Sequence, residues 1–178
     1  MGAADEALMV AAVRSGDPGA FALLYERFRP LVFSAAFRIT GDADAAEDVV
    51  QETFIQVHEA LPRWRPEGRL STWIYRIAVN RALDEKRRAR RRPLPESRHD
   101  GPLPEAAAVP ARDGSTSDRI REAVAGLPER ERAVFVLRHY EGLPLAEIAE
   151  VLEIALGTVK ATLHHALLKL SRGLEDLR

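Results

Sequence analysis

The segment "GRLSTWIYRIAVNRALDEKRRARR", residues 68–91, decides the fold. Its apolar residues Ile74, Ile77 and Ala78 recur at spacings of three and four, which predicts an amphipathic helix from Ser71 to Arg91. Leu, Ala, Arg and Glu are abundant in the whole chain and runs of β-branched residues are rare, which favours helix elsewhere as well. We therefore expect an all-α fold.

Helical periodicity also occurs on the N-terminal side of this segment. Asp17 and Pro18 are typical of a helix start, with proline at the first helical position, and Gly41 is typical of the end of the segment that follows. Asp42 or Asp44 then caps a further helix. The expected apolar positions are Phe21, Leu24, Tyr25 and Phe28 before Gly41, and Val49, Val50, Phe54 and Val57 after it.

On the C-terminal side, residues 93–116 interrupt the helical pattern. They read "PLPESRHDGPLPEAAAVPARDGST" and hold five of the eleven prolines, with no periodic apolar face. Ordered loops of this length are uncommon inside a compact domain. We therefore expect two small helical domains, residues 1–92 and 117–178, joined by a flexible Pro-rich linker.

The second domain has the pattern of a helix-turn-helix. Pro128 opens one helix, and a turn at Glu153 and Ile154 separates two later ones. The shorter of these carries Leu145, Ile148, Ala149 and Leu152, and the longer one turns inward Leu156, Val159, Leu163, Ala166 and Leu170. Two helices of this size with a tight turn between them favour a helix-turn-helix.

The net charge of −1 hides a strongly basic segment. Residues 61–92 hold eleven Arg and Lys residues against three acidic residues, whereas residues 1–60 hold four arginines against ten acidic residues. A basic block of this kind is typical of a polyanion-binding surface, and the alternative is a solvated helix face. Residues 119–178 carry no net charge.

Several classes of function are disfavoured by what the sequence lacks. The absence of cysteine excludes a disulfide framework, a zinc finger and a thiol catalyst. The five histidines show no H-E-x-x-H spacing, and there is no phosphate loop or nucleophile elbow, so we expect no enzyme, cofactor or metal site. The longest nearly apolar stretch, residues 31–37, is too short for a membrane span and the acidic N-terminus is no secretory signal. A cytoplasmic protein without membrane insertion is expected.

Aromatic and basic residues are interleaved between positions 63 and 76. Trp64, Trp73 and Tyr75 lie among arginines at positions 63, 65, 69 and 76. Aromatic rings stack on the bases of single-stranded nucleic acid while cations hold its backbone, so this mixture indicates such a ligand. Core packing is the alternative for Trp73, which lies at an apolar position of the pattern, whereas Trp64 lies in a proline-flanked loop.

Two long segments resemble a group IV (extracytoplasmic-function, ECF) sigma factor of the sigma-70 family. "GDADAAEDVVQETFIQVHEALPRW", followed by the segment quoted first, is similar to region 2, and "LPERERAVFVLRHYEGLPLAEIAEVLEIALGTVKATLHHAL" is similar to region 4. The resemblance covers nearly the whole chain outside the linker. It implies a factor that binds core RNA polymerase (β′ clamp and β flap), recognises the −10 and −35 promoter elements and initiates transcription. An anti-sigma factor is implied as a further partner.

The resemblance also implies roles for individual residues. It implies a polymerase-binding face of Asp48, Gln51, Glu52 and Ile55. A cation site is the alternative for the carboxylates of this segment, but the spacing lacks the pattern of an EF-hand loop. The implied −10 residues are Arg63, Trp64, Arg69, Trp73, Arg76, Asn80, Arg87 and Arg88. The implied −35 residues are Thr158, Lys160, Ala161, Thr162, His164 and His165.

The expected recognition helix departs from the family's usual pattern. Ala161 stands where the family has serine, and Thr162 and His165 stand where it has arginine. In the turn before it, Glu153 replaces the usual glycine and Ala155 replaces a Ser-like cap. Because the DNA-facing side is poor in fixed positive charge, we expect weak −35 binding by this domain alone.

Two alternatives to a complete sigma factor remain. One is a sigma-like regulator whose second domain binds a protein partner in place of −35 DNA. The other is a helix-turn-helix repressor, which leaves residues 1–92 without a role.

Overall fold

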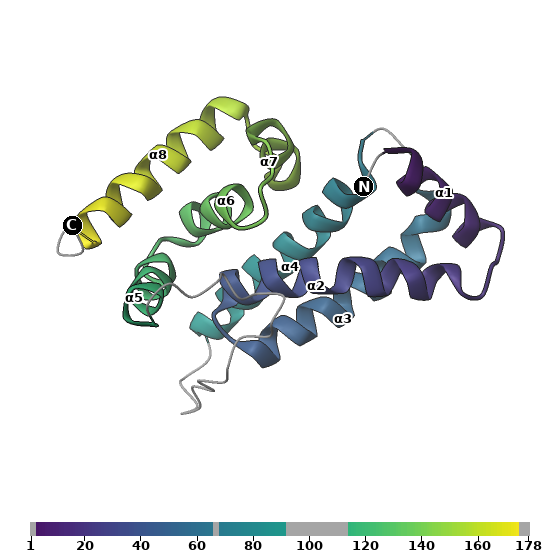
Figure 1. The fold of residues 1–178 in the computed structure, drawn as a ribbon, viewed down its shortest axis with the longest axis horizontal. Helices are drawn as coiled ribbons and strands as arrows, with labels where there is room; N and C mark the ends of the chain where they lie inside the picture. The colour runs from purple at the N-terminus through teal and green to yellow at the C-terminus, as the bar shows by residue number, and fades with distance from the viewer. Residues whose placement is uncertain (1–2, 66–67, 92–113, 175–178) are drawn as a thin grey trace.

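The computed structural model describes residues 3–65, 68–91 and 114–174, and every regular element in these ranges is a helix (Figure 1). The expected all-α fold class is confirmed. The N-terminal domain contains α1 (Ala3–Arg14), α2 (Ala20–Thr40), α3 (Ala43–Ala60), a 3-10 turn (Leu61–Arg63) and α4 (Leu70–Arg91). The C-terminal domain contains α5 (Gly114–Ala125), α6 (Glu129–His139), α7 (Leu145–Leu152) and α8 (Leu156–Gly173). Residues 93–113 of the expected linker lie outside the described residues, and its last three residues belong to α5.

Helices α2, α3 and α4 form the body of the N-terminal domain, and α1 packs against α2 and the 3-10 turn (Figure 1). Each long helix turns its apolar stripe inward. The side chains that are fully buried there include Leu24, Phe28, Val50, Val57, Ile74 and Val79. Removal of this apolar surface from water holds the three helices together.

The helix boundaries follow local chemistry that the sequence shows only in part. Gly41 ends α2 in the left-handed conformation, with φ 77°, and the Asp42 side chain caps α3 by accepting from the backbone N–H of Ala45 at 2.9 Å. The expected start of α2 at Asp17 and Pro18 is wrong, since the helix begins at Ala20. The Asp17 carboxylate instead accepts from the backbone N–H of Gly19, which stabilises a turn ahead of the helix.

The C-terminal domain contains the expected helix-turn-helix, formed by α7 and α8. Glu153 ends α7 with φ 52° and ψ 44°, the left-handed conformation that usually favours glycine, and Ala155 precedes α8 without a side-chain cap. Leu156 is 40% exposed, so its expected inward position is wrong, because it opens the helix directly after the turn. Among the described residues no single helix is long and apolar enough to cross a membrane, and α7 and α8 meet that test only as a pair bent by 103°.

The two domains lie against each other along α4 (Figure 1). Helix α7 packs against α4, and α6 packs against α2 and α4. As a result, Val134, Leu137, Ile148 and Val151 of the C-terminal domain share one buried apolar cluster with the N-terminal core. No sequence pattern predicted this contact between the domains.

Candidate nucleic-acid interface

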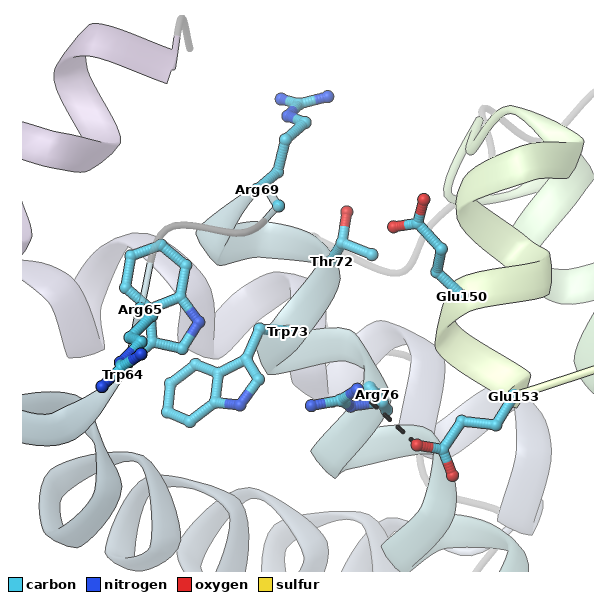
Figure 2. A pocket seen from close by; sticks show the side chains of 9 residues that line it. Trp64, Arg65, Arg69, Thr72, Trp73, Arg76, Glu150 and Glu153 are labelled. Carbon is cyan, nitrogen blue, oxygen red and sulfur yellow. Dashed lines mark ion pairs between the residues drawn. The ribbon is translucent and has the colours of Figure 1, made fainter.

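A cavity of about 590 Å³ lies where the segment after the 3-10 turn meets α4 and α7 (Figure 2). Trp64 and Trp73 line it, with their ring centroids 6.0 Å apart and their planes at 43°. Arg65, Arg69 and Arg76 line it too. Both tryptophans are half-buried and pack against the core, so Trp73 has the core contact that the sequence left open and also lines the cavity. Indole faces beside guanidinium groups suit a flexible, negatively charged strand with bases.

Two side chains of helix α1 make polar contacts with this segment, one near each end. Glu6 is only 3% exposed, and its carboxylate accepts from the backbone N–H of Leu70, the first residue of α4, at 2.7 Å. The same carboxylate lies 3.7 Å from the guanidinium of Arg69, and Arg14 donates to the backbone carbonyl of Trp64. Sequence reasoning missed Glu6 and Arg14, since their partners are distant in the chain.

The remaining expected −10 residues lie on α4 and just before it. Trp73, Arg76, Asn80 and Arg87 are spaced by three, four and seven residues, which places them along one side of the helix. Asn80, Arg87 and Arg88 are exposed, as is Arg63 in the 3-10 turn. The structure thus brings the eight expected residues onto one loop and the helix that follows it.

The expected polymerase face lies on α3. Asp48, Gln51, Glu52 and Ile55 are all exposed, and Ile55 is 60% exposed. Beside Ile55 is a hollow of about 420 Å³ whose other walls include Phe21, Tyr25, Phe54 and His58. The contributions of α2 to this hollow were not predicted. No three His, Asp or Glu side chains of the described residues are grouped as a metal site would need.

The α8 residues expected to face −35 DNA point into solvent. Thr158, Lys160, Ala161, His164 and His165 are exposed, and Thr162 is half-buried. A hollow of about 460 Å³ separates this face from the start of α6, where the exposed Arg130 contributes a cation that sequence reasoning missed. Lys169 is engaged elsewhere, with its Nζ 2.7 Å from the carboxylate of Glu131.

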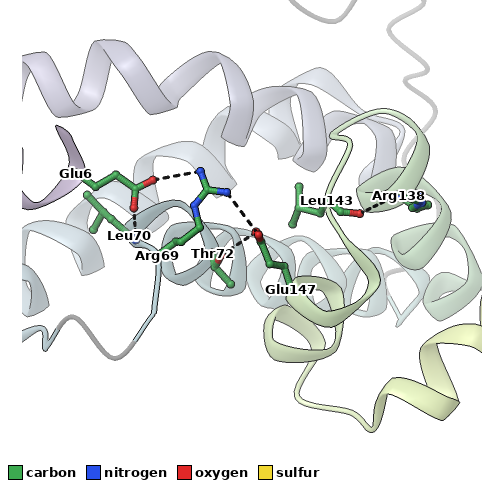
Figure 3. A network of polar contacts seen from close by, with 7 residues as sticks. All are labelled: Glu6, Arg69, Leu70, Thr72, Arg138, Leu143 and Glu147. Carbon is green, nitrogen blue, oxygen red and sulfur yellow. Dashed lines mark hydrogen bonds and ion pairs between the residues drawn. The ribbon is translucent and has the colours of Figure 1, made fainter. Parts of the chain in front are cut away.

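Acidic residues of the C-terminal domain contact Thr72 and two of the arginines that are expected −10 residues, one of them shown in Figure 3. Thr72 donates to the Glu147 carboxylate at 3.1 Å, and the Arg69 guanidinium lies 3.4 Å from it. Further along α4, Arg76 lies 3.6 Å from Glu153 (Figure 2).

A second polar cluster joins the domains beside α2. The Glu141 carboxylate accepts from the hydroxyls of Tyr75 at 2.8 Å and Ser34 at 2.9 Å. Burial raises the pKa of the Glu141 carboxyl above its usual value, although the bonds from Tyr75 and Ser34 and the nearby Arg38 guanidinium oppose the rise. Burial also raises the pKa of the Tyr75 hydroxyl, and the Glu141 charge adds to that effect.

Comparison with known proteins places both domains in one family. Residues 24–92 match Sigma-70 region 2 and residues 117–170 match Sigma-70, region 4. The ECF RNA polymerase sigma factor SigW of Bacillus subtilis is 31% identical over 179 residues, covering 93% of this chain and 94% of the relative. SigL of Mycobacterium tuberculosis, also an ECF RNA polymerase sigma factor, is 36% identical over 157 residues, covering 86% and 88% of the two chains.

Solved structures agree with these relatives. The structure of CnrH in complex with the cytosolic domain of CnrY covers 96% of this chain and 97% of that one, at 26% identity and a TM-score of 0.71. The sigma factor RpoE of Bartonella quintana, solved with the anti-sigma factor NepR, shares the fold with a TM-score of 0.67 at 19% identity. The chain therefore belongs to the sigma-70 family and is an ECF sigma factor, an initiation factor that directs RNA polymerase to promoters.

Proposed function

We propose that this sigma factor divides promoter recognition among three surfaces of its helices. The face of Asp48, Gln51, Glu52 and Ile55 on α3 binds the β′ clamp of core polymerase. The Trp64–Trp73 cavity and the exposed side of α4 hold the −10 strand, and α8 contacts the −35 duplex. The factor itself is no enzyme in this proposal, since polymerase carries out the chemistry, and both act in the cytoplasm.

The Trp64–Trp73 pair is the observation that carries the proposal. Two half-buried indoles surrounded by Arg65, Arg69 and Arg76 offer stacking surfaces and phosphate contacts within one cavity. Stacking of a base on an aromatic side chain contributes about 1–3 kcal/mol. Such a site favours an unpaired strand over a duplex, because paired bases cannot expose their faces.

The polymerase surface is supported by the composition of the α3 face. Ile55 is exposed between polar neighbours and lies next to an apolar hollow. Protein interfaces commonly centre on an apolar residue with a polar rim. The Glu52 carboxylate lies 2.8 Å from the Arg81 guanidinium of α4, and α3 packs directly against α4, so this face is next to the helix that carries the proposed −10 surface.

Control by an anti-sigma factor is part of the proposal. CnrH was solved bound to the cytosolic domain of CnrY, and the matched chain of that structure resembles this chain over nearly its whole length. The exposed apolar side chains of α8, Leu167 at 43% and Leu168 at 45%, favour a protein partner for part of this helix. A C-terminal domain that binds protein in place of −35 DNA is thus the second candidate function.

Trp64→Ala and Trp73→Ala test the −10 site in transcription with core polymerase. Each is expected to reduce permanganate reactivity of the opened −10 region about tenfold or more, from the lost stacking. Trp64→Phe and Trp73→Phe keep a ring and serve as matched controls. Core binding is measured by pull-down on the same samples, and unchanged −10 reactivity of folded Ala variants would refute the site. Deletion of the −35 sequence from the promoter tests the second candidate function. If the C-terminal domain binds a protein in place of −35 DNA, the deletion has no effect on transcription.

A further inference from the structure

We propose that Arg130, at the start of α6, binds a backbone phosphate of the −35 duplex and supplies positive charge that the DNA-facing side of α8 lacks. The residue lies outside the helix-turn-helix that α7 and α8 form. This inference rests on the −35 contact of α8 proposed above and adds to it a residue that holds the DNA backbone.

The first support is the shortage of cations on α8 itself. Lys160 is the only lysine or arginine among the expected −35 residues. Lys169 of the same helix pairs with Glu131 at 2.7 Å, and Arg172 lies about 15 Å beyond Thr162 along the helix axis. B-DNA carries one negative charge per about 1.7 Å of its axis, so duplex binding depends on the number of phosphates that cations contact. A neighbouring element that supplies a cation therefore strengthens the contact.

The second support is the place of Arg130 beside α8. A hollow of about 460 Å³ separates the start of α6 from the DNA-facing side of α8. An α-helix in the major groove, which is about 12 Å wide, has a phosphate backbone on either side of it. An element that lies beside α8 therefore meets the backbone and not the base edges. The hollow is lined by Arg130 on α6 and by Gly157, Thr158, Ala161, Thr162 and His165 on α8.

The third support is that the Arg130 guanidinium is available. Its side chain is exposed, and no carboxylate in the described part of the chain forms an ion pair with it. The acidic residues on either side of it are engaged, Glu131 with Lys169 and Glu129 with Arg87 at 3.8 Å. Glu131 also lines the hollow, but its pairing with Lys169 offsets its repulsion of a phosphate. A guanidinium presents a planar fork of donors that matches a phosphate group.

Arg130→Ala tests the contact in the full-length factor bound to core polymerase. The probe is a fluorescent duplex that carries a −35 element and ends before the −10 element, and its binding is followed by anisotropy across a salt series. Loss of one phosphate contact is expected to reduce the log–log salt slope by about 0.9 and to weaken binding about fivefold at roughly 0.15 M salt. Arg130→Lys keeps a cation that binds phosphate and is expected to stay close to the parent.

Arg121→Ala is the matched control for lost positive charge. Arg121 is an exposed arginine of α5 that pairs with Asp118 at 2.8 Å and does not line the hollow. Its removal is expected to leave the salt slope at the parent value. Thermal unfolding followed by circular dichroism is expected to be unchanged in all three variants, because both arginines are exposed.

A second duplex with a scrambled −35 sequence separates backbone contact from base reading. A phosphate contact carries no sequence information, so Arg130→Ala is expected to weaken binding of both duplexes by the same factor. A loss confined to the −35 sequence overturns the assignment, as does a slope equal to that of Arg121→Ala. Preference of the parent for the −35 duplex tests the proposed function of α8 separately, so failure of that function and failure of Arg130 give different results.

The lost charge is then placed on the opposite wall of the hollow. In the Arg130→Ala background, His165→Arg adds a guanidinium at the hollow, whereas Ala125→Arg adds one outside the residues that line it. The first double variant is expected to recover most of the lost salt slope and the second is not. Equal slopes of the two double variants contradict the placement of a phosphate at this hollow.

Discussion

At the residue scale, Glu6 is a charged side chain in an unusually buried position. It is almost fully buried, yet it accepts from the first backbone N–H of α4 and lies beside Arg69. A buried carboxylate at a helix start satisfies a donor that the helix leaves unpaired. A residue of α1 therefore fixes the start of the helix that carries the −10 surface.

Glu6→Ala is expected to reduce the free energy of unfolding by about 0.5–2 kcal/mol, the usual loss for a helix cap. Glu6→Gln retains an acceptor oxygen and is expected to lose less. Urea unfolding followed by circular dichroism measures both. Equal stability of Glu6→Ala and the parent contradicts the capping role.

Glu141 gives the interdomain contact a dependence on pH. Because its pKa is raised in the folded chain, the folded state holds the proton more tightly than the unfolded state does. Its contribution to stability is therefore fully present below the usual glutamate pKa and is lost as pH rises through the raised value. Tyr75, Ser34 and Arg38 surround this carboxylate.

Glu141→Gln removes this titration while keeping one acceptor oxygen. The stability of the variant relative to the parent is expected to increase as pH rises from about 4.5 to 7. Chemical denaturation across that range measures the difference. A constant difference shows that the pKa of Glu141 is the same in the folded and unfolded chains.

At the scale of elements, the helix-turn-helix shows how far sequence patterns reach. The spacing of Val159, Ala166 and Leu170 predicted the buried side of α8, and the turn expected at Glu153 and Ile154 is present, with Glu153 in the left-handed conformation. The exposed Leu156 and the later start of α2 were missed. Both errors concern helix ends. Too few residues lie there for the periodic pattern to locate the boundary, and local side-chain hydrogen bonds determine where the helix begins.

His165→Arg is expected to strengthen −35 duplex binding by the holoenzyme and to steepen its salt dependence by about 0.9 in log–log slope. The side chain is exposed on α8 and borders the hollow that also contacts Arg130. Ala125→Arg adds the same charge at the end of α5, outside the residues that line this hollow. Fluorescence anisotropy across a salt series compares them, and equal slopes for the two variants argue against α8 as the −35 reader.

At the scale of the whole molecule, the shared core is the feature that sequence could not reveal. Ile148 was an expected apolar position of its helix, and it is buried. Periodicity shows which side of a helix is apolar but not which neighbour covers it. The eight expected −10 residues lie in the 3-10 turn, the segment after it and α4. The acidic residues that pair with three of their arginines belong to the other domain, which the linker led us to expect to be separate.

Ile148→Ala tests the shared core. The side chain is fully buried between the domains' helices, so the change is expected to reduce the free energy of unfolding by about 2–5 kcal/mol. Leu168→Ala removes a similar volume from an exposed position and is expected to change stability by less than about 0.5 kcal/mol. Calorimetry is also expected to show one transition in the parent, and two separate transitions would indicate independent domains.

The continuous core has a consequence for the exchange of parts between related factors. Domains that fold independently can be recombined at a linker without regard to their partner, but here Val134, Leu137, Ile148 and Val151 complete a hydrophobic surface that the other half supplies. A chimera that takes its C-terminal half from a relative must carry matching residues at these positions and at Glu141. Inherited changes on one side of the contact are thereby tied to changes on the other, so the two halves of this factor are constrained to evolve as a pair.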